Sequence, residues 1–197
     1  LDCAPILHKL GGTTVVRLSQ VLVMKGGGSA LPSEAEVLNF AASEPGMRAP
    51  RIHRSFFIDD ESEYFGKMGY IVMDFIPGQP LDGCWNSLPY EIQKSVSIQV
   101  ADMIKVMQSV VLSKSHFSPF GGGPCRGKFF TDYSAGPFKD HAEMEKWFNH
   151  KLETCKHVKR APQDTPAFHF TTSVLVQGDI SPRNLALDSL GQVWLID

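Results

Sequence analysis

The chain has 197 residues, of which 43% are hydrophobic, 20% charged and 10% aromatic, which is the composition of an ordinary globular protein. Lys and Arg number 19 against 21 Asp and Glu, so the formal net charge is -2. These figures exclude collagen-like and wholly disordered chains, and they disfavour a protein that binds the phosphate backbone of nucleic acids.

The cysteines and the apolar runs indicate the cellular compartment in which the protein is expected. No C-x-x-C pair occurs and the cysteine spacings are long and irregular, which favours free thiols in a reducing cytoplasm over a zinc site or a disulfide framework. No apolar run approaches the roughly 18 residues that span a bilayer, and no signal peptide is visible. We therefore expect a cytoplasmic protein without a membrane or nucleic-acid partner. The four cysteines are Cys3, Cys84, Cys125 and Cys155.

The first part of the chain reads as a β-rich lobe with one helix. β-branched and apolar runs predict the strands, and Pro32 at a first-turn position predicts the start of the helix. Gly26-Gly27-Gly28 is expected to break the second strand, and Pro77-Gly78-Gln79-Pro80 to end the lobe. The strands are predicted over 13–18, 21–25, 52–58 and 69–75, and the helix over 32–42.

The second part turns helical. Apolar residues from Ile92 to Val110 recur at steps of three and four, which predicts an amphipathic helix, and Met144 to Cys155 repeats the pattern. Residues 117–137, rich in Gly, Pro and aromatics, are expected to form a long ordered loop. Near the end, Leu185-Ala186-Leu187 and Val193-Trp194-Leu195 predict a hairpin.

These elements predict an α+β fold of two lobes, with a β-rich lobe at 1–77 and a helical lobe at 78–197 that carries the hairpin. The chain starts at Leu1 and stops at Asp197 directly after the apolar run Val193–Ile196. Since termini usually lie exposed, we expect a helical lobe that is truncated at its C-terminal end.

Three polar residues near the end of the chain suit phosphoryl transfer. The segment Gln177-Gly178-Asp179-Ile180-Ser181-Pro182-Arg183-Asn184 places Asp179 five residues before Asn184, and the hairpin can return Asp197 close to Asn184. An amide and a carboxylate side by side suit a hard cation such as Mg²⁺. Asp179 can then accept the proton of a hydroxyl group.

This segment resembles the catalytic loop of the kinase-like superfamily, specifically the branch that holds aminoglycoside phosphotransferases and choline kinases, including fungal proteins with an aminoglycoside phosphotransferase domain. The Asp and Asn spacing is shared with the protein-kinase loop H-R-D-x-x-x-x-N. Ile196-Asp197 is similar to the start of the branch's I-D-W/F segment. The resemblance implies that Asp179 is the catalytic base and that Asn184 and Asp197 are Mg²⁺ ligands.

The first lobe carries matching motifs in the same order. Leu22-Val23-Met24-Lys25 is similar to V-A-I-K, and the run that starts at Glu34 resembles the E-A-x-x-L opening of the branch's first helix. Glu34 shares a helical face with Leu38 and Ala41, so it points inward, where it needs a cation, and Lys25 is the nearest candidate. Glu36, a capping acid at the spacing of a capping box, is the rival partner.

The run Met73-Asp74-Phe75-Ile76 resembles the hinge whose backbone would hold the adenine of ATP. Two departures from the family's pattern stand beside these matches. No G-x-G-x-x-G loop is present, so Gly11-Gly12 could serve only as a reduced phosphate loop, and Gln177 stands where His is common.

The sequence as a whole therefore predicts an ATP- and Mg²⁺-dependent phosphotransferase that acts on a hydroxyl group of a small molecule. Two alternatives remain open at this point: a pseudokinase, meaning a non-catalytic nucleotide-binding or interaction protein, and a protein kinase. Scattered histidines without an H-x-x-x-H pair give a metal-hydrolase function little support.

Overall fold

The computed structural model divides the chain into two compact units, Leu1–Met107 with Asp179–Asp197, and Gln108–Gly178. The proposed site residues all belong to the first unit. The boundary predicted after residue 77 separates lobes by function, and it stays a prediction. The structure describes residues 4–28, 30, 32–62, 66–110, 117–119, 122–125, 129–130 and 135–197.

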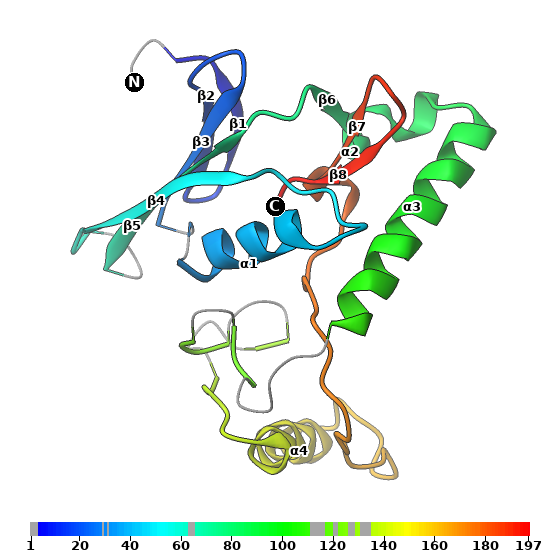
Figure 1. Cartoon of the computed structure of the whole chain (residues 1–197). Coiled ribbons are helices and arrows are strands. Elements are labelled where there is room, and N and C mark those ends of the chain that lie inside the picture. Colours follow the sequence, from blue (N-terminus) through cyan, green and yellow to red (C-terminus); the bar gives the residue numbers. More distant parts are fainter. Residues whose placement is uncertain are drawn as a thin grey trace. The chain divides into compact units, whose positions relative to one another are not determined.

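The first unit contains a five-stranded antiparallel sheet in the order β1-β2-β3-β5-β4 (Figure 1). The four predicted strands are confirmed, and β1 is an addition. All five residues of β1 are exposed at the edge of the sheet, so its sequence carries no alternation of buried and exposed positions. The strands are β1 Ile6–Leu10, β2 Thr13–Arg17, β3 Leu22–Gly27, β4 Ile52–Asp59 and β5 Lys67–Asp74.

The glycine run after Lys25 does not break its strand as predicted, because β3 continues through Gly27. Gly27 has φ of 142°, and a Cβ there would lie 1.8 Å from the carbonyl oxygen of Gly12. A Cβ on Gly26 would lie 2.8 Å from the ring of Tyr70. These glycines are strand residues at which neighbouring groups approach too closely for a side chain.

The predicted helix is α1, Pro32–Ser43. Ala35, Leu38 and Ala41 follow one another at three-residue intervals and are all buried. This apolar face anchors the helix in the first unit, and α1 contacts β4. The rotation of α1 about its own axis, and with it the direction of Glu34, is fixed by that burial.

A second sheet, of three strands, holds the predicted hairpin. Its order is β6-β7-β8, with β6 Gly78–Pro80, β7 Leu185–Asp188 and β8 Val193–Leu195. The predicted hairpin is confirmed. The Pro/Gly segment expected to be only a break between lobes forms β6, which pairs with β7.

The chain continues from β6 through α2 Leu81–Cys84 and the 3-10 helix η1 Trp85–Ser87 into the long helix α3, Tyr90–Ser109. Val96, Met103 and Met107 of the predicted stripe are buried. Gln99 of α3 braces the hairpin: its side-chain oxygen accepts the N–H of Val193 at 3.0 Å, and its amide donates to the Gly191 carbonyl at 2.9 Å.

The second unit holds α4, His141–His157, which matches the second predicted helix. Asp140 accepts the N–H of Glu143 at 2.9 Å and Glu143 accepts the N–H of Lys139 at 2.8 Å, which ties down the first turn. Cys125, Ala135 and Phe138 form a small core. The predicted loop at 117–137 falls partly outside the described residues, and the short apolar run at 174–176 forms no strand.

Two further findings concern membrane-spanning segments and the cysteines. Within the described ranges, no helix combines the length and the apolar character needed to cross a membrane. Cys84, Cys125 and Cys155 are free thiols, and Cys3 lies outside the described residues.

Candidate active site

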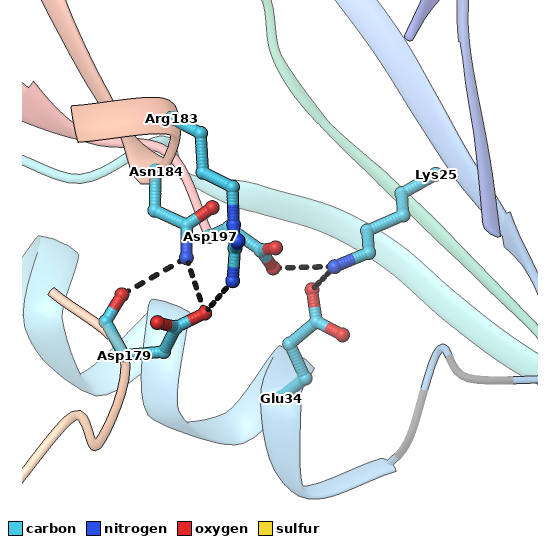
Figure 2. Close-up of polar contacts among 6 residues, drawn as sticks. All are labelled: Lys25, Glu34, Asp179, Arg183, Asn184 and Asp197. Carbon is cyan, nitrogen blue, oxygen red and sulfur yellow. Dashed lines mark hydrogen bonds and ion pairs between the residues drawn. The ribbon is translucent and has the colours of Figure 1, made fainter. Parts of the chain in front are cut away.

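Lys25 lies inside strand β3 and is 8% exposed, so burial of its ammonium group requires partners. Its Nζ lies 2.7 Å from Oε1 of Glu34 on α1, and it also forms an ion pair with Oδ1 of Asp197 (Figure 2). Glu36 is exposed on the same helix. The structure therefore contains the pair expected between Lys25 and Glu34, and it adds Asp197 to that pair.

One cation between two carboxylates determines the protonation of this cluster. Burial alone would lower the pKa of Lys25, but the charges of Glu34 and Asp197 outweigh burial and raise it. Burial raises the pKa of Glu34 to about 7, against the attraction of Lys25 and with the repulsion of Asp197. Lys25 thus stays charged, while Glu34, the more buried of the two carboxylates, readily accepts a proton.

The loop that starts at Asp179 is held by Asn184, which is buried in the 3-10 helix η2, Pro182–Asn184. The side-chain nitrogen of Asn184 donates to the Asp179 carbonyl at 2.9 Å and to its Oδ2 at 3.1 Å. The loop thereby closes on itself and fixes the direction of the Asp179 carboxylate, which is itself 55% exposed.

The hairpin brings Asp197 to the same place. The N–H of Ile196 donates to the carbonyl of Asn184 at 2.9 Å, and the N–H of Leu195 donates to the carbonyl of Arg48 at 2.8 Å. The predicted return of the chain past Asn184 is therefore present. The two residues expected to hold Mg²⁺ are joined by the backbone next to them.

The donor set fits a magnesium ion. Figure 2 shows the amide nitrogen of Asn184 turned toward Asp179, which leaves its oxygen on the other side, and Asp197 contributes a carboxylate. Among the described residues, no group of three or more His, Cys, Asp or Glu could hold a metal. Mg²⁺ usually takes one or two protein carboxylates and fills its other positions with water and substrate phosphates, so two protein ligands suffice.

Arg183 is the site residue that the sequence analysis did not assign a role. Its Nη2 lies 2.5 Å from Oδ2 of Asp179, four residues earlier in the chain. Asp179 precedes the 3-10 helix, so the i,i+4 rule for α-helices does not apply and no local periodicity predicts this contact. Arg183 places a positive charge directly against the proposed base, and its side chain is 50% exposed.

The predicted hinge, residues 73–76, spans the end of β5. The side chain of Asp74 bonds to Nε2 of His53 at 2.6 Å, so it is turned toward β4. The N–H of Phe75 donates to the Val21 carbonyl at 2.8 Å. Ile76 accepts the N–H of Gly78 at 2.8 Å, and its own N–H donates to no group in the described part of the chain. Met73, the fourth predicted residue, is buried in β5.

The Gly11-Gly12 pair forms the turn between β1 and β2, and Gly11 has φ of 56°. β2 pairs with β3, and Val15 faces Lys25 in that pairing. The reduced glycine loop is therefore on the strand pair next to the lysine. The triplet Gly121-Gly122-Gly123 lies partly outside the described residues.

No family model and no curated protein sequence matches this chain. Solved structures do match it. The streptomycin–ATP complex of APH(2'')-IIa aligns with a TM-score of 0.57 at 13% identity, and ADP-bound aminoglycoside phosphotransferase APH(2'')-Ib with 0.53 at 12%. The GDP and kanamycin complex of APH(2'')-IIia aligns with 0.59 at 13%. The chain has the fold of the aminoglycoside phosphotransferases.

The predicted α+β kinase-like fold is thereby confirmed. The alignments cover 98%, 98% and 100% of this chain and 65%, 64% and 69% of the three phosphotransferases. The chain thus spans about two thirds of the length of the structures that it matches. At these identities the likeness establishes the fold alone, and the resemblance to fungal proteins stays a prediction.

Proposed function

We propose that this chain is an ATP-dependent phosphotransferase that transfers a phosphoryl group to a hydroxyl group of a small molecule. The observation that carries the proposal is the position of five residues in one compact unit: Lys25, Glu34 and Asp197 in one ion cluster, and Asp179 and Asn184 in one closed loop. The fold shared with nucleotide-bound phosphotransferases supports it. The predicted cytoplasmic location belongs to the same proposal.

Asp179 is the general base. The acceptor oxygen attacks the γ-phosphorus of ATP, the bond between that phosphorus and the β,γ-bridging oxygen breaks, and ADP leaves. Asp179 takes the proton that the acceptor hydroxyl loses. One hydrogen bond from Asn184 and the ion pair with Arg183 hold the carboxylate in one orientation, which is what a positioned base requires.

Lys25 binds the phosphates that stay on the nucleotide. The ion pair with Glu34 keeps the ammonium group of Lys25 extended toward the site, because an unpaired lysine would lose its position. Asn184 and Asp197 would hold Mg²⁺, which neutralises phosphate charge when bound. Lys25 then exchanges its contact with Asp197 for a phosphate oxygen while it keeps the contact with Glu34.

The hinge supplies the adenine contacts. The backbone N–H groups of Phe75 and Asp74 already donate to protein carbonyls, so the N–H of Ile76 is the amide donor that this run can offer to a ring nitrogen. Pro77 follows it and has no N–H. Met73, Asp74 and Phe75 position that amide through the β5 pairing and the contact with Val21.

The proposal is tested by Asp179→Asn in an ADP-release assay with Mg²⁺ and ATP, run with and without hydroxyl acceptors. Loss of a general base costs about 10²–10⁴-fold in rate. We expect Asp179→Asn to lose turnover within that range and to bind ATP as the unsubstituted protein does. Asp164→Asn, the same change at an exposed position outside the unit that holds the site, is the matched control.

ATP binding without turnover, unchanged by Asp179→Asn, would instead support the non-catalytic alternative. Phosphate transfer to a general protein substrate in preference to small molecules would support the protein-kinase alternative. Equal turnover by Asp179→Asn and Asp164→Asn would place the base elsewhere.

A further inference from the structure

A cavity of about 410 Å³, largely open to solvent, borders the loop from Asp179 to Asn184 on the side of Arg183. Two segments form it, one from α2 and η1 and one from the start of η2, and both belong to the first compact unit. α2 and η2 contact one another directly, so the two walls are fixed relative to each other. The lining residues are Asp82, Trp85, Asn86, Ser181, Pro182 and Arg183.

The turn that carries Trp85 is braced. Nε2 of Gln93 donates to the Trp85 carbonyl at 2.9 Å, and the N–H of Leu88 donates to the same oxygen at 3.2 Å. The indole ring is half-buried and supplies an apolar surface. Other lining residues supply hydrogen-bond donors and acceptors.

The chemistry of this lining suits a ring that carries several hydroxyl groups. Asp82 accepts hydrogen bonds, Asn86 both accepts and donates, and the guanidinium of Arg183 donates. Nε and Nη1 of Arg183 donate to no group in the described residues, because only Nη2 contacts Asp179. The face of such a ring packs on an aromatic side chain while its hydroxyls bond outward.

The charges of the cavity oppose a polycation. Asp82 is the single carboxylate of the lining, and Arg183 places a positive charge between the cavity and the Asp179 carboxylate. An acceptor with several ammonium groups needs several carboxylates to bind them, and here it meets a guanidinium at the point where its hydroxyl must reach Asp179.

Ser181 contributes a buried polar group to the same wall. Oγ of Ser181 is buried and has no hydrogen-bond partner among the described residues. A buried polar atom left unpaired costs about 1–3 kcal/mol. Because this oxygen has almost no accessible surface, it adds a cost to the wall of the cavity and offers no hydrogen bond to a ligand.

We propose that this cavity binds the phosphoryl acceptor, and that the acceptor is an uncharged polyhydroxylated ring, such as a sugar or cyclitol without amino groups. The inference rests on the proposed phosphotransferase function and narrows its substrate class. Arg183 is the residue that excludes polycationic acceptors, while Asp82, Asn86 and Trp85 bind the ring.

The test measures kcat/KM for kanamycin, glucose and myo-inositol with Mg²⁺ and ATP in the unsubstituted protein, Arg183→Glu and Arg160→Glu. Arg183→Glu also disturbs Asp179, which lowers the rate with every acceptor. The measured quantity is therefore the ratio of kcat/KM for a neutral polyol to kcat/KM for kanamycin, because a loss of rate common to both acceptors cancels in this ratio. We expect this ratio to be at least 10 in the unsubstituted protein, to fall at least tenfold in Arg183→Glu, and to stay within twofold in Arg160→Glu.

Binding supplies a readout besides turnover. With ADP and Mg²⁺ present, myo-inositol or glucose should change the tryptophan fluorescence, and Trp85→Phe should remove that change. Ser181→Ala should leave the stability of the free protein unchanged or higher, because it removes a buried hydroxyl without a partner among the described residues.

The failures are distinguishable. A protein that binds ATP but prefers kanamycin, or one whose ratio is the same in Arg183→Glu, overturns the acceptor assignment and leaves the phosphotransferase proposal standing. Binding of ATP with no response to either neutral polyol in turnover or fluorescence also overturns it. If Asp82→Ala weakens ATP binding but not 2',3'-dideoxy-ATP binding, the cavity binds the ribose and the assignment is wrong. Absence of ATP binding contradicts the proposed function itself.

Discussion

The two halves of the candidate site are built in opposite ways. The cluster of Lys25, Glu34 and Asp197 joins a strand, a helix and the end of a hairpin, and the lysine side chain is only 10% exposed. The loop from Asp179 to Asn184 is local, and its ion pair of Asp179 and Arg183 is half-exposed. If the proposed function holds, the buried cluster couples nucleotide binding to folding, whereas the exposed loop can change its chemistry at little cost to stability.

The largest expected effect follows from breaking the buried cluster. Lys25→Ala leaves two carboxylates facing each other, one of them largely buried, and removing one partner of a buried ion pair costs about 3–5 kcal/mol. We expect urea denaturation at pH 8 to show a loss of this size. At pH 5.5 the loss should be smaller, because Glu34 can then take up a proton. An equal loss at both pH values would contradict the charge assignment.

The next effect concerns Glu34 alone. Its pKa in the folded protein is about 7, above the ordinary value for a glutamate, so between about pH 4.5 and 7 the folded protein holds a proton that the unfolded chain has released. Stability therefore falls as pH rises through this window, by at most about 1.4 kcal/mol per pH unit. Glu34→Gln should flatten that slope in nucleotide-free protein. An unchanged slope would place the titrating group elsewhere.

The affinity for nucleotide should distinguish the two glutamates of α1, Glu34 and Glu36. Glu34→Ala should weaken Mg²⁺–ATP binding in the same direction as Lys25→Ala and by a smaller factor, because Lys25 keeps its charge but loses its fixed position. Glu36→Ala is the matched control, since Glu36 is exposed on the same helix. Calorimetric titration with ATP checks this, and weaker binding by Glu36→Ala alone would reverse the assignment.

The smallest expected change in stability concerns the exposed loop from Asp179 to Asn184. Arg183→Gln removes an ion pair whose members are 50% and 55% exposed, and such pairs contribute about 0–1 kcal/mol. The free energy of unfolding should therefore change by less than about 1 kcal/mol while the acceptor preference changes. A loss comparable to that of Lys25→Ala would show that the loop is a structural element after all.

The sequence predicts the parts of the site that local periodicity determines. The direction of Glu34 follows from its helical spacing to Leu38 and Ala41, both of which are 2% exposed. The return of Asp197 follows from a short hairpin between two apolar runs. The contact between Arg183 and Asp179 does not follow from such spacing, because Asp179 lies in the loop before the 3-10 helix.

Long-range contacts explain what the sequence does not predict. Gly78–Pro80 has no strand pattern of its own and becomes β6 because β7, more than 100 residues later, pairs with it. Gly26 and Gly27 suggest a break, yet they are strand residues because they pair with both β2 and β5. The cavity beside Arg183 combines two segments that no local pattern connects.

The proposed separate roles of the Lys25 cluster and the Asp179 loop are tested most directly by calorimetric titration of Mg²⁺–ATP into Lys25→Ala and Asp179→Asn. If the buried cluster binds the nucleotide and the exposed loop performs the chemistry, Lys25→Ala loses at least tenfold in affinity and Asp179→Asn stays within twofold of the unsubstituted protein. Equal affinity in all three proteins, or a loss confined to Asp179→Asn, would contradict this account.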